Sequence, residues 1–278
     1  MSLFFYPLLL FLFVSCIGPA NHQDQVVSTP LISPGGKTIL TRFNPPDGYK
    51  RTEVDSTSFA NYLRSLPLKP YGSMVHYYNG EEKRNNAVAA AVVDVTVGDK
   101  DLQQCADAVI RLRADYLRSS GREDEIVFNF TNGTPASWDK WKNGYRCIIS
   151  GNNVRWEKSA TYSETGKTFN NYLETLFIYA GSLSLEKELI ASNTGDIQAG
   201  NVFIQGGSPG HAVIVVDVAL NDAGEKLFLL AQSYMPAQDI HVLINPNDED
   251  ISPWYRFNKG DKLITPEWVF ESGSLKRF

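Results

Sequence analysis

The sequence predicts an α+β fold in which helices come first and an antiparallel set of strands follows. Four apolar runs with turn residues between them, "NVFIQ", "HAVIVVDVA", "KLFLLAQS" and "DIHVLIN", occupy residues 201–245 and are typical of consecutive strands. Upstream, "DKDLQQCADAVIRLRADYLRSS" (99–120) repeats apolar residues at helical spacing. Strands and helices do not alternate, so a parallel sheet is not expected.

The first half supplies the remaining elements. "DSTSFANYLRSLPL" (55–68) predicts a helix capped by Asp55 or Ser56, and "AVAAAVVDVTVG" (87–98) predicts a strand with apolar residues on both faces. Short strands are expected at 126–130 and 145–150. A helix from 166 to 180 and a second helix after the break at Gly181 complete the pattern. We expect these helices and a smaller N-terminal sheet to pack against the C-terminal strands.

The N-terminus has the composition of an export signal. The apolar run from Leu3 to Val14 is shorter than the ~20 residues that span a bilayer, but it fits a signal peptide. Residues 1–16 resemble a signal peptide that ends in the lipobox of bacterial lipoproteins, which implies lipidation of Cys16. Residues 17–47, rich in proline, are predicted to be a flexible tether. The expected location is the cell envelope, with the chain anchored to a bacterial membrane by lipid.

Composition narrows the classes of function. The chain has 278 residues and a formal net charge of −5, without a basic cluster, so no nucleic-acid partner is expected. Cys105 and Cys147 lie outside any CxxC or Cys/His cluster, so neither a metal site nor an organic cofactor is predicted. An exported pair of cysteines could form a disulfide, and the sequence leaves that question open.

The clearest candidate for chemistry is His211, which begins a β-branched run after "GGSPG" (206–210). Residues 199–233 resemble the papain-like cell-wall peptidases and amidases, through "GNVF" at 200–203, Gly210 and His211 on the next strand, and Gln232 on the third strand. The resemblance implies that His211 is the general base and that Gln232 orients its imidazole. It also implies a papain-like antiparallel barrel, with its core at about 165–245 in a single domain of 48–278.

The nucleophile is the open question. Aligned through Ala180-Gly181, the family's cysteine falls at Phe169, or at Thr168 one residue earlier, and neither side chain is a cysteine. Cys105 is the alternative because it lies about a turn inside the start of the 99–120 helix, where the helix dipole favours a thiolate. It also lies on the apolar face of that helix, where a cysteine is more often an inert core residue.

Several polar and aromatic residues are candidates for ligand binding. Trp138 and Trp141 could stack on a sugar ring, or could cover an edge of the domain. The other candidates flank the predicted site and are Ser208, Gly210, Ser233 and Tyr234. The expected partner is a cell-wall peptide, a glycan fragment or an envelope protein.

From "LPLKPYGS" to the closing "TPEWVFESGSLKRF", the chain is identified as a member of domain-of-unknown-function family 4846, which consists of uncharacterised bacterial lipoproteins. That resemblance implies an envelope location without an activity. Two functions remain in view. The first is a module that binds cell-wall peptides with degenerate or absent catalysis. The second is an active cysteine amidase that uses Cys105, His211 and Gln232.

Overall fold

The computed structural model describes residues 1–3, 29–258 and 260–278. The α-helices in these ranges are α1 (Ile39–Arg42), α2 (Phe59–Arg64), α3 (Cys105–Ser119), α4 (Trp138–Lys142), α5 (Gly166–Tyr179) and α6 (Ser182–Glu188). The strands are β1 (Tyr49–Arg51), β2 (Ala89–Val92), β3 (Val127–Asn129), β4 (Pro135–Ser137), β5 (Tyr145–Ser150), β6 (Asn153–Lys158), β7 (Ile190–Ala191), β8 (Val202–Gln205), β9 (His211–Asn221), β10 (Lys226–Gln232), β11 (His241–Leu243), β12 (Tyr255–Arg256), β13 (Leu263–Ile264), β14 (Val269–Phe270) and β15 (Leu275–Arg277). The predicted α+β class is therefore confirmed.

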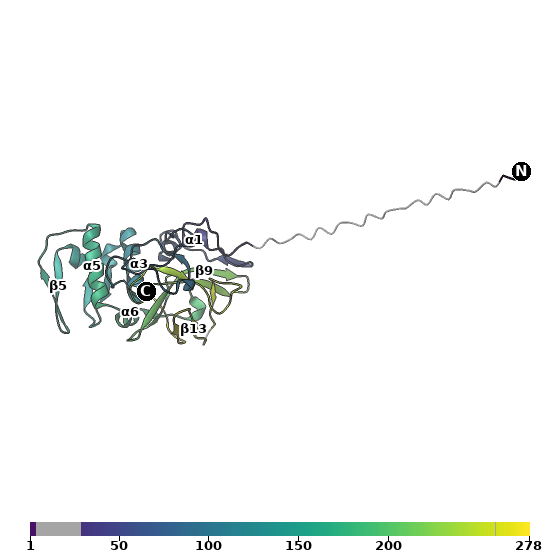
Figure 1. Cartoon of the computed structure of the whole chain (residues 1–278). Helices are drawn as coiled ribbons and strands as arrows, with labels where there is room; N and C mark the ends of the chain where they lie inside the picture. Colours follow the sequence, from purple (N-terminus) through teal and green to yellow (C-terminus); the bar gives the residue numbers. More distant parts are fainter. Residues whose placement is uncertain (4–28, 259) are drawn as a thin grey trace.

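One large antiparallel sheet organises the domain (Figure 1). Its strands run in the order β2-β11-β10-β9-β8-β15-β7, with β1 also paired to β9 and β12 to β10. The four strands expected in residues 201–245 are its centre. The predicted closed barrel is wrong, because β2 and β7 end the sheet without pairing to each other among the described strands. The prediction of a smaller N-terminal sheet is also wrong in part, since β2 joins the large sheet.

Both faces of the central strands are buried. On β9, Ala212, Ile214 and Val216 pack in the core that includes α3, whereas Val213 and Val215 pack with Tyr255 and Phe270 on the other face. Alternate residues of a strand point to opposite faces, which explains why the run after His211 is continuously apolar. The helices thus cover one face, and the C-terminal segment covers the other.

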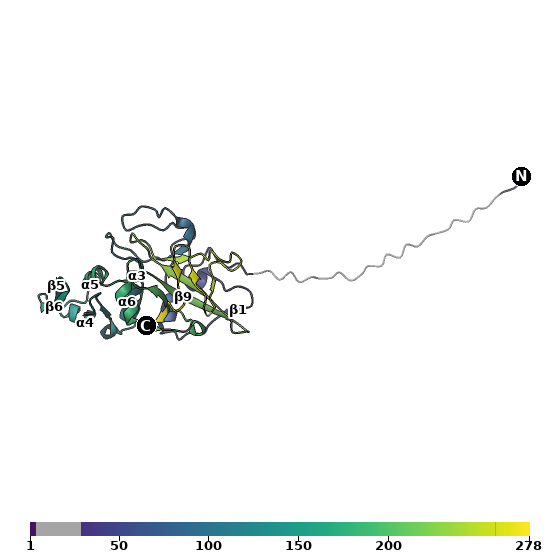
Figure 2. The same ribbon diagram turned by 90° about the horizontal axis from the view of Figure 1, so that it is seen from below.

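The ends of the helices follow their local sequence. Ser58, and not Asp55 or Ser56, caps α2 by accepting the backbone N–H of Asn61. The predicted break at Gly181 separates α5 from α6. The two-stranded sheet β5–β6 lies beside α5, at the end of the molecule remote from β9 (Figures 1 and 2).

The folded domain begins before the predicted boundary at residue 48. Ile39 of α1 and Phe43 are fully buried in the main core, so the expected tether does not extend to residue 47. Burial of two large apolar side chains stabilises this segment against the sheet. The lipobox, Cys16 and the first part of the tether, residues 17–28, lie outside the described residues.

Candidate functional site

His211 is the first residue of β9 and its side chain is fully buried. Its imidazole lies among three aromatic rings, with centroid distances of 4.9 Å to Tyr234, 5.3 Å to Trp268 and 5.7 Å to Phe270. The ring belongs to the face of the sheet that the C-terminal segment covers. Burial lowers the pKa of His211 to about 4, although the hydrogen bond to Gln232 opposes that shift. The imidazole is therefore neutral at pH 7.

The hydrogen bonds around Gln232 define which nitrogen of His211 carries the proton. Gln232 Nε2 donates to the Glu267 carboxylate over 2.7 Å, and a carboxylate can only accept. The amide oxygen Oε1 therefore faces His211 Nε2, at 2.9 Å. Nε2 must be the protonated nitrogen, so the lone pair of the neutral ring is on Nδ1. Nδ1 has no hydrogen-bond partner among the described residues.

A second histidine and a lysine complete this network. His241 Nδ1 donates to the Asp239 carbonyl over 2.9 Å, which leaves its Nε2 to accept from Gln232 Nε2 at 3.4 Å. Lys83 Nζ pairs with the other oxygen of Glu267 at 2.7 Å. This nearly buried cation offsets the charge of Glu267. Glu267 thus binds Lys83 with one carboxylate oxygen and the Gln232 amide with the other.

Cys105 is the first residue of α3. Its thiol lies near the backbone N–H of Ala212, the residue after His211, which helps to lower the pKa of the thiol. Only 6% of Cys105 is exposed, and burial, followed by the charge of Asp107, raises the pKa of the thiol to about 11. No hydrogen bond joins Sγ to His211 Nδ1 in the described part of the chain. Cys105 and Cys147 are both free thiols, so they do not form a disulfide.

A cavity of about 420 Å³ opens beside Cys105. It is lined by the start of α3, the start of α6 and the glycine-rich loop before His211. Cys105, Asp107, Ser182, Ser208 and Gly210 are among its lining residues. The predicted binding residues Ser208 and Gly210 therefore lie in this wall. Tyr234 packs against the His211 ring at 4.9 Å. Burial, followed by Glu267 and Cys105, raises the pKa of its phenol.

Gly210 lies where a side chain has no room. A Cβ there would come within 2.3 Å of Ser182 Oγ and 2.7 Å of the Gly207 carbonyl oxygen. We expect Gly210→Ala to displace the loop and lower the stability by about 1–3 kcal/mol, with a matching fall in the melting temperature. The control is Gly166→Ala, because nothing lies within 4 Å of a Cβ at Gly166. Equal melting temperatures for the two variants would contradict the close packing.

Glu267→Gln tests the orientation of the Gln232 amide. A glutamine at position 267 can donate as well as accept, so it can pair with Gln232 in either orientation. A flipped amide would place the proton of His211 on Nδ1. We expect any reaction that uses His211 as a base to lose about tenfold or more in kcat, with little change in KM. A preference of about 1.4 kcal/mol for the flipped amide is enough to cause a tenfold loss. ¹⁵N chemical shifts of the imidazole report the tautomer, and unchanged shifts would contradict the assignment.

Other predicted residues lie elsewhere. Ser233 is buried, and its hydroxyl shares its one proton between the carbonyls of Gln103 (3.0 Å) and Gln238 (2.8 Å), so it connects the segment before α3 to the end of β10. Trp138 and Trp141 are buried against α5, where their faces are closed to a sugar ring. Trp138 packs on Phe169 at 5.0 Å, so the position aligned with the family's cysteine is a core residue as well.

Glu267, Lys83 and Asp107 were not among the site residues predicted from the sequence. Glu267 and Lys83 lie in segments without a recognisable pattern, far along the chain from His211. Asp107 is an acidic residue next to the apolar stripe of the 99–120 helix, and this pattern is visible in the sequence. The structure shows that its side chain is buried. Buried carboxylates without a partner are uncommon and merit inspection.

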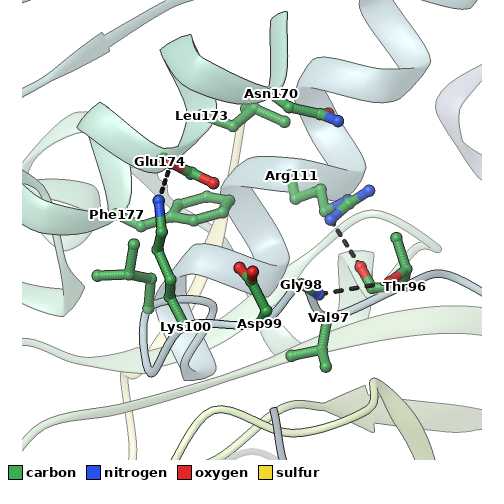
Figure 3. Close-up of a pocket in the computed structure, with 11 residues that line it drawn as sticks. Thr96, Val97, Gly98, Asp99, Lys100, Arg111, Asn170, Leu173, Glu174 and Phe177 are labelled. Atoms are coloured by element: carbon green, nitrogen blue, oxygen red, sulfur yellow. Dashed lines mark hydrogen bonds and ion pairs between the residues drawn. The ribbon is translucent and has the colours of Figure 1, made fainter. Parts of the chain in front are cut away.

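A second hollow, shown in Figure 3, lies between α3, α5 and residues 96–102. Its volume is about 80 Å³, and two of the cations in its wall are already paired. Lys100 Nζ contacts Glu174 at 2.8 Å, and Arg111 Nη1 donates to the Thr96 carbonyl at 2.8 Å. None of the predicted site residues lines it. The cavity beside Cys105 is therefore the better candidate site.

The fold and the site define an α+β protein with a hydrogen-bonded His211–Gln232 pair in its antiparallel sheet and a cavity lined by Cys105. The chain belongs to the family described as Domain of unknown function (4846), whose model matches residues 39–277. Comparisons with the curated proteins and with the solved structures returned no match. Among residues 1–3, 29–258 and 260–278, no helix is long and apolar enough to cross a membrane.

Proposed function

We propose that this protein is a cysteine amidase that cleaves an amide bond in cell-wall peptides, with Cys105 as the nucleophile and His211 as the general base. The observation that carries the proposal is the position of the Cys105 thiol. It lies at the first turn of α3, near the backbone N–H of the residue after His211. Among the described residues, Nδ1 of His211 has no hydrogen-bond partner, while Gln232 holds Nε2.

The reaction divides into two steps. Sγ attacks the carbonyl carbon as His211 Nδ1 takes the thiol proton. The proton then passes to the leaving nitrogen, the C–N bond breaks, and a thioester remains on Cys105. In the second step water attacks the thioester while Nδ1 accepts its proton, and the C–S bond breaks to release a carboxylic acid and the thiol. The first N–H groups of α3 have no partner within the helix and can donate to the developing oxyanion.

The thiol of Cys105 and the imidazole of His211 are both uncharged in the resting site. Because burial raises the pKa of the thiol and lowers that of the imidazole, a neutral thiol faces a neutral base until a substrate enters. Proton transfer then has to accompany attack by sulfur, as in general-base catalysis. A thioether-forming reagent that does not fill the cavity, such as iodoacetamide, should therefore react slowly at pH 7.

The pH dependence of hydrolysis follows from the same shift. His211 works only as a neutral base, and its pKa is about 4 instead of the usual 6.5. We expect kcat/KM to stay level as the pH falls from 7 to about 5 and to decline only near pH 4. A pH profile of initial rates measures this. A decline centred on pH 6.5 would contradict the burial of the ring.

The substrate class rests on the resemblance of residues 199–233 to cell-wall peptidases and on the proposed signal peptide and lipid anchor at Cys16. A lipid-anchored envelope protein would meet peptides released from the cell wall. No metal or organic cofactor has a role in this proposal.

One observation favours a second candidate function. The raised pKa of Cys105 and the lack of a hydrogen bond between Sγ and Nδ1 in the described residues also suit a module that only binds the peptide. In that case the cavity would hold the ligand, and the thiol would remain inert.

The test is to incubate the full chain with soluble muropeptides and to follow new free amino groups by mass spectrometry. Hydrolysis that disappears in His211→Ala is the expected result. Muropeptides that bind but remain intact would overturn the amidase and support the binding module.

A further inference from the structure

We propose that the cavity beside Cys105 is a subsite for a primary ammonium group of the substrate and that Asp107 is its anchor. This inference rests on the proposed function of the cavity and names its substrate class. The substrates would be peptides with a free amino group close to the scissile carbonyl.

Asp107 is the third residue of α3 and lines the cavity. One carboxylate oxygen, Oδ2, accepts the backbone N–H of Gln104 over 3.0 Å. This bond turns the side chain back toward the start of the helix, where Cys105 lies. The other oxygen, Oδ1, is buried and has no partner in the described part of the chain.

Helix capping explains only half of this carboxyl group. A carboxylate at the third helical position commonly accepts the N–H before the helix, and Oδ2 does so here. An asparagine could supply the same acceptor without a charge. The buried, unpartnered Oδ1 costs free energy unless a ligand satisfies it. Residues that sacrifice stability in this way concentrate at binding sites.

The ionisable side chains that line the cavity indicate the charge of the ligand. Of the residues that line the cavity, only Asp107 and Cys105 have ionisable side chains; no lysine, arginine or histidine is among them. A carboxylate ligand would meet Asp107 without a compensating cation. An ammonium group would instead form a charge-assisted hydrogen bond with Oδ1. Its positive charge, together with the helix N-terminus, would lower the pKa of Asp107 from about 8, so that the carboxyl group ionises as the ligand binds.

The spacing along α3 limits the position of the amino group. Cys105 and Asp107 are two residues apart in α3, so their Cα atoms are about 5 Å apart. One residue of an extended peptide substrate spans about 3.3–3.6 Å. With the scissile carbonyl at Cys105, the ammonium group falls on the residue that supplies this carbonyl or on the residue before it. The enzyme would thus act on the amino-terminal end of a short peptide.

Binding is measured on the full chain carrying Cys105→Ala, so that no reaction can take place. The probes are L-alaninamide, which has a free amino group, and N-acetyl-L-alaninamide, which does not. The readout is the ¹H–¹⁵N shifts of the Gly207 and Gly210 amides in the cavity wall. We expect the free amine to bind at least tenfold more tightly than the acetylated probe. Adding Asp107→Asn should abolish that preference, and adding Asp124→Asn, at an exposed acid remote from the cavity, should retain it.

Equal binding of the two probes, or a preference that survives Asp107→Asn, would overturn the subsite. If the asparagine variant does not fold, the two probes on the Cys105→Ala chain still decide the question by themselves. The result is independent of the hydrolase assay. Selective binding without turnover in the wild-type chain would overturn the amidase alone, and turnover without selectivity for the amine would overturn the subsite alone.

Discussion

Cys105→Ala is expected to reduce hydrolysis of muropeptides by about 10⁴-fold or more in kcat, because removal of the nucleophile eliminates the thioester step. Binding should persist, since the substitution removes one small side chain from the wall of a cavity. Initial rates by mass spectrometry and binding by titration separate the two effects.

The matched control for this variant is Cys147→Ala. Cys147 is half-buried on β5, opposite Trp156 of β6, in the part of the molecule remote from β9. It should leave turnover unchanged. Activity that survives Cys105→Ala would identify another nucleophile, and loss of activity in both variants would indicate a general loss of folding.

Asp107→Asn is expected to stabilise the protein at alkaline pH. Burial raises the pKa of Asp107 to about 8, against 3.8 for the exposed group. The unfolded chain therefore loses this proton near pH 4, whereas the folded chain retains it until about pH 8. Between these values the unfolded state binds fewer protons, so this residue makes the folded state progressively less stable as the pH rises.

The Asp107→Asn variant has no carboxyl group at this position, so it does not lose stability in this way as the pH rises. At pH 8 it should exceed the wild type in free energy of unfolding by about 3–5 kcal/mol, at about 1.4 kcal/mol for each unit of pKa shift, and near pH 4 the difference should vanish. Denaturant titrations at pH 4, 6 and 8 measure it. Glu188, whose pKa burial raises to about 7, is present in both proteins and cancels in the comparison. A constant difference between the variants at all three values would contradict the buried, unpaired carboxyl.

The regular elements could be predicted because their signals are local. The helical spacing in residues 99–120 and 166–180 and the apolar runs of 201–245 correspond to α3, α5 and β8–β11. Closure of the sheet was predicted wrongly because it depends on the partners of its end strands. β2 comes from residues 89–92 and β7 from 190–191, and nothing in their sequence specifies what lies beside them.

The candidate site also contains some residues that could be predicted from the sequence and others that could not. His211 and Gln232 are on neighbouring strands joined by a short turn, so their contact could be expected from order and spacing. Cys105 reaches them from a helix far earlier in the chain, and its role remained open in the sequence alone. Glu267 could not be found, because its contact with Gln232 depends on how the C-terminal segment crosses the sheet. Trp138 and Trp141 were misplaced because an aromatic cluster in a core and one on a surface have the same composition.

The hydrogen bond from Gln232 to Glu267 has a consequence for the timing of assembly. Glu267 lies 35 residues after Gln232 along the chain, in the segment that covers the His211 face of the sheet. A chain that is synthesised only as far as β11 therefore has Cys105, His211 and His241 but lacks the carboxylate that orients the amide. The tautomer of His211 would then be set only after the segment with Glu267 docks on the sheet.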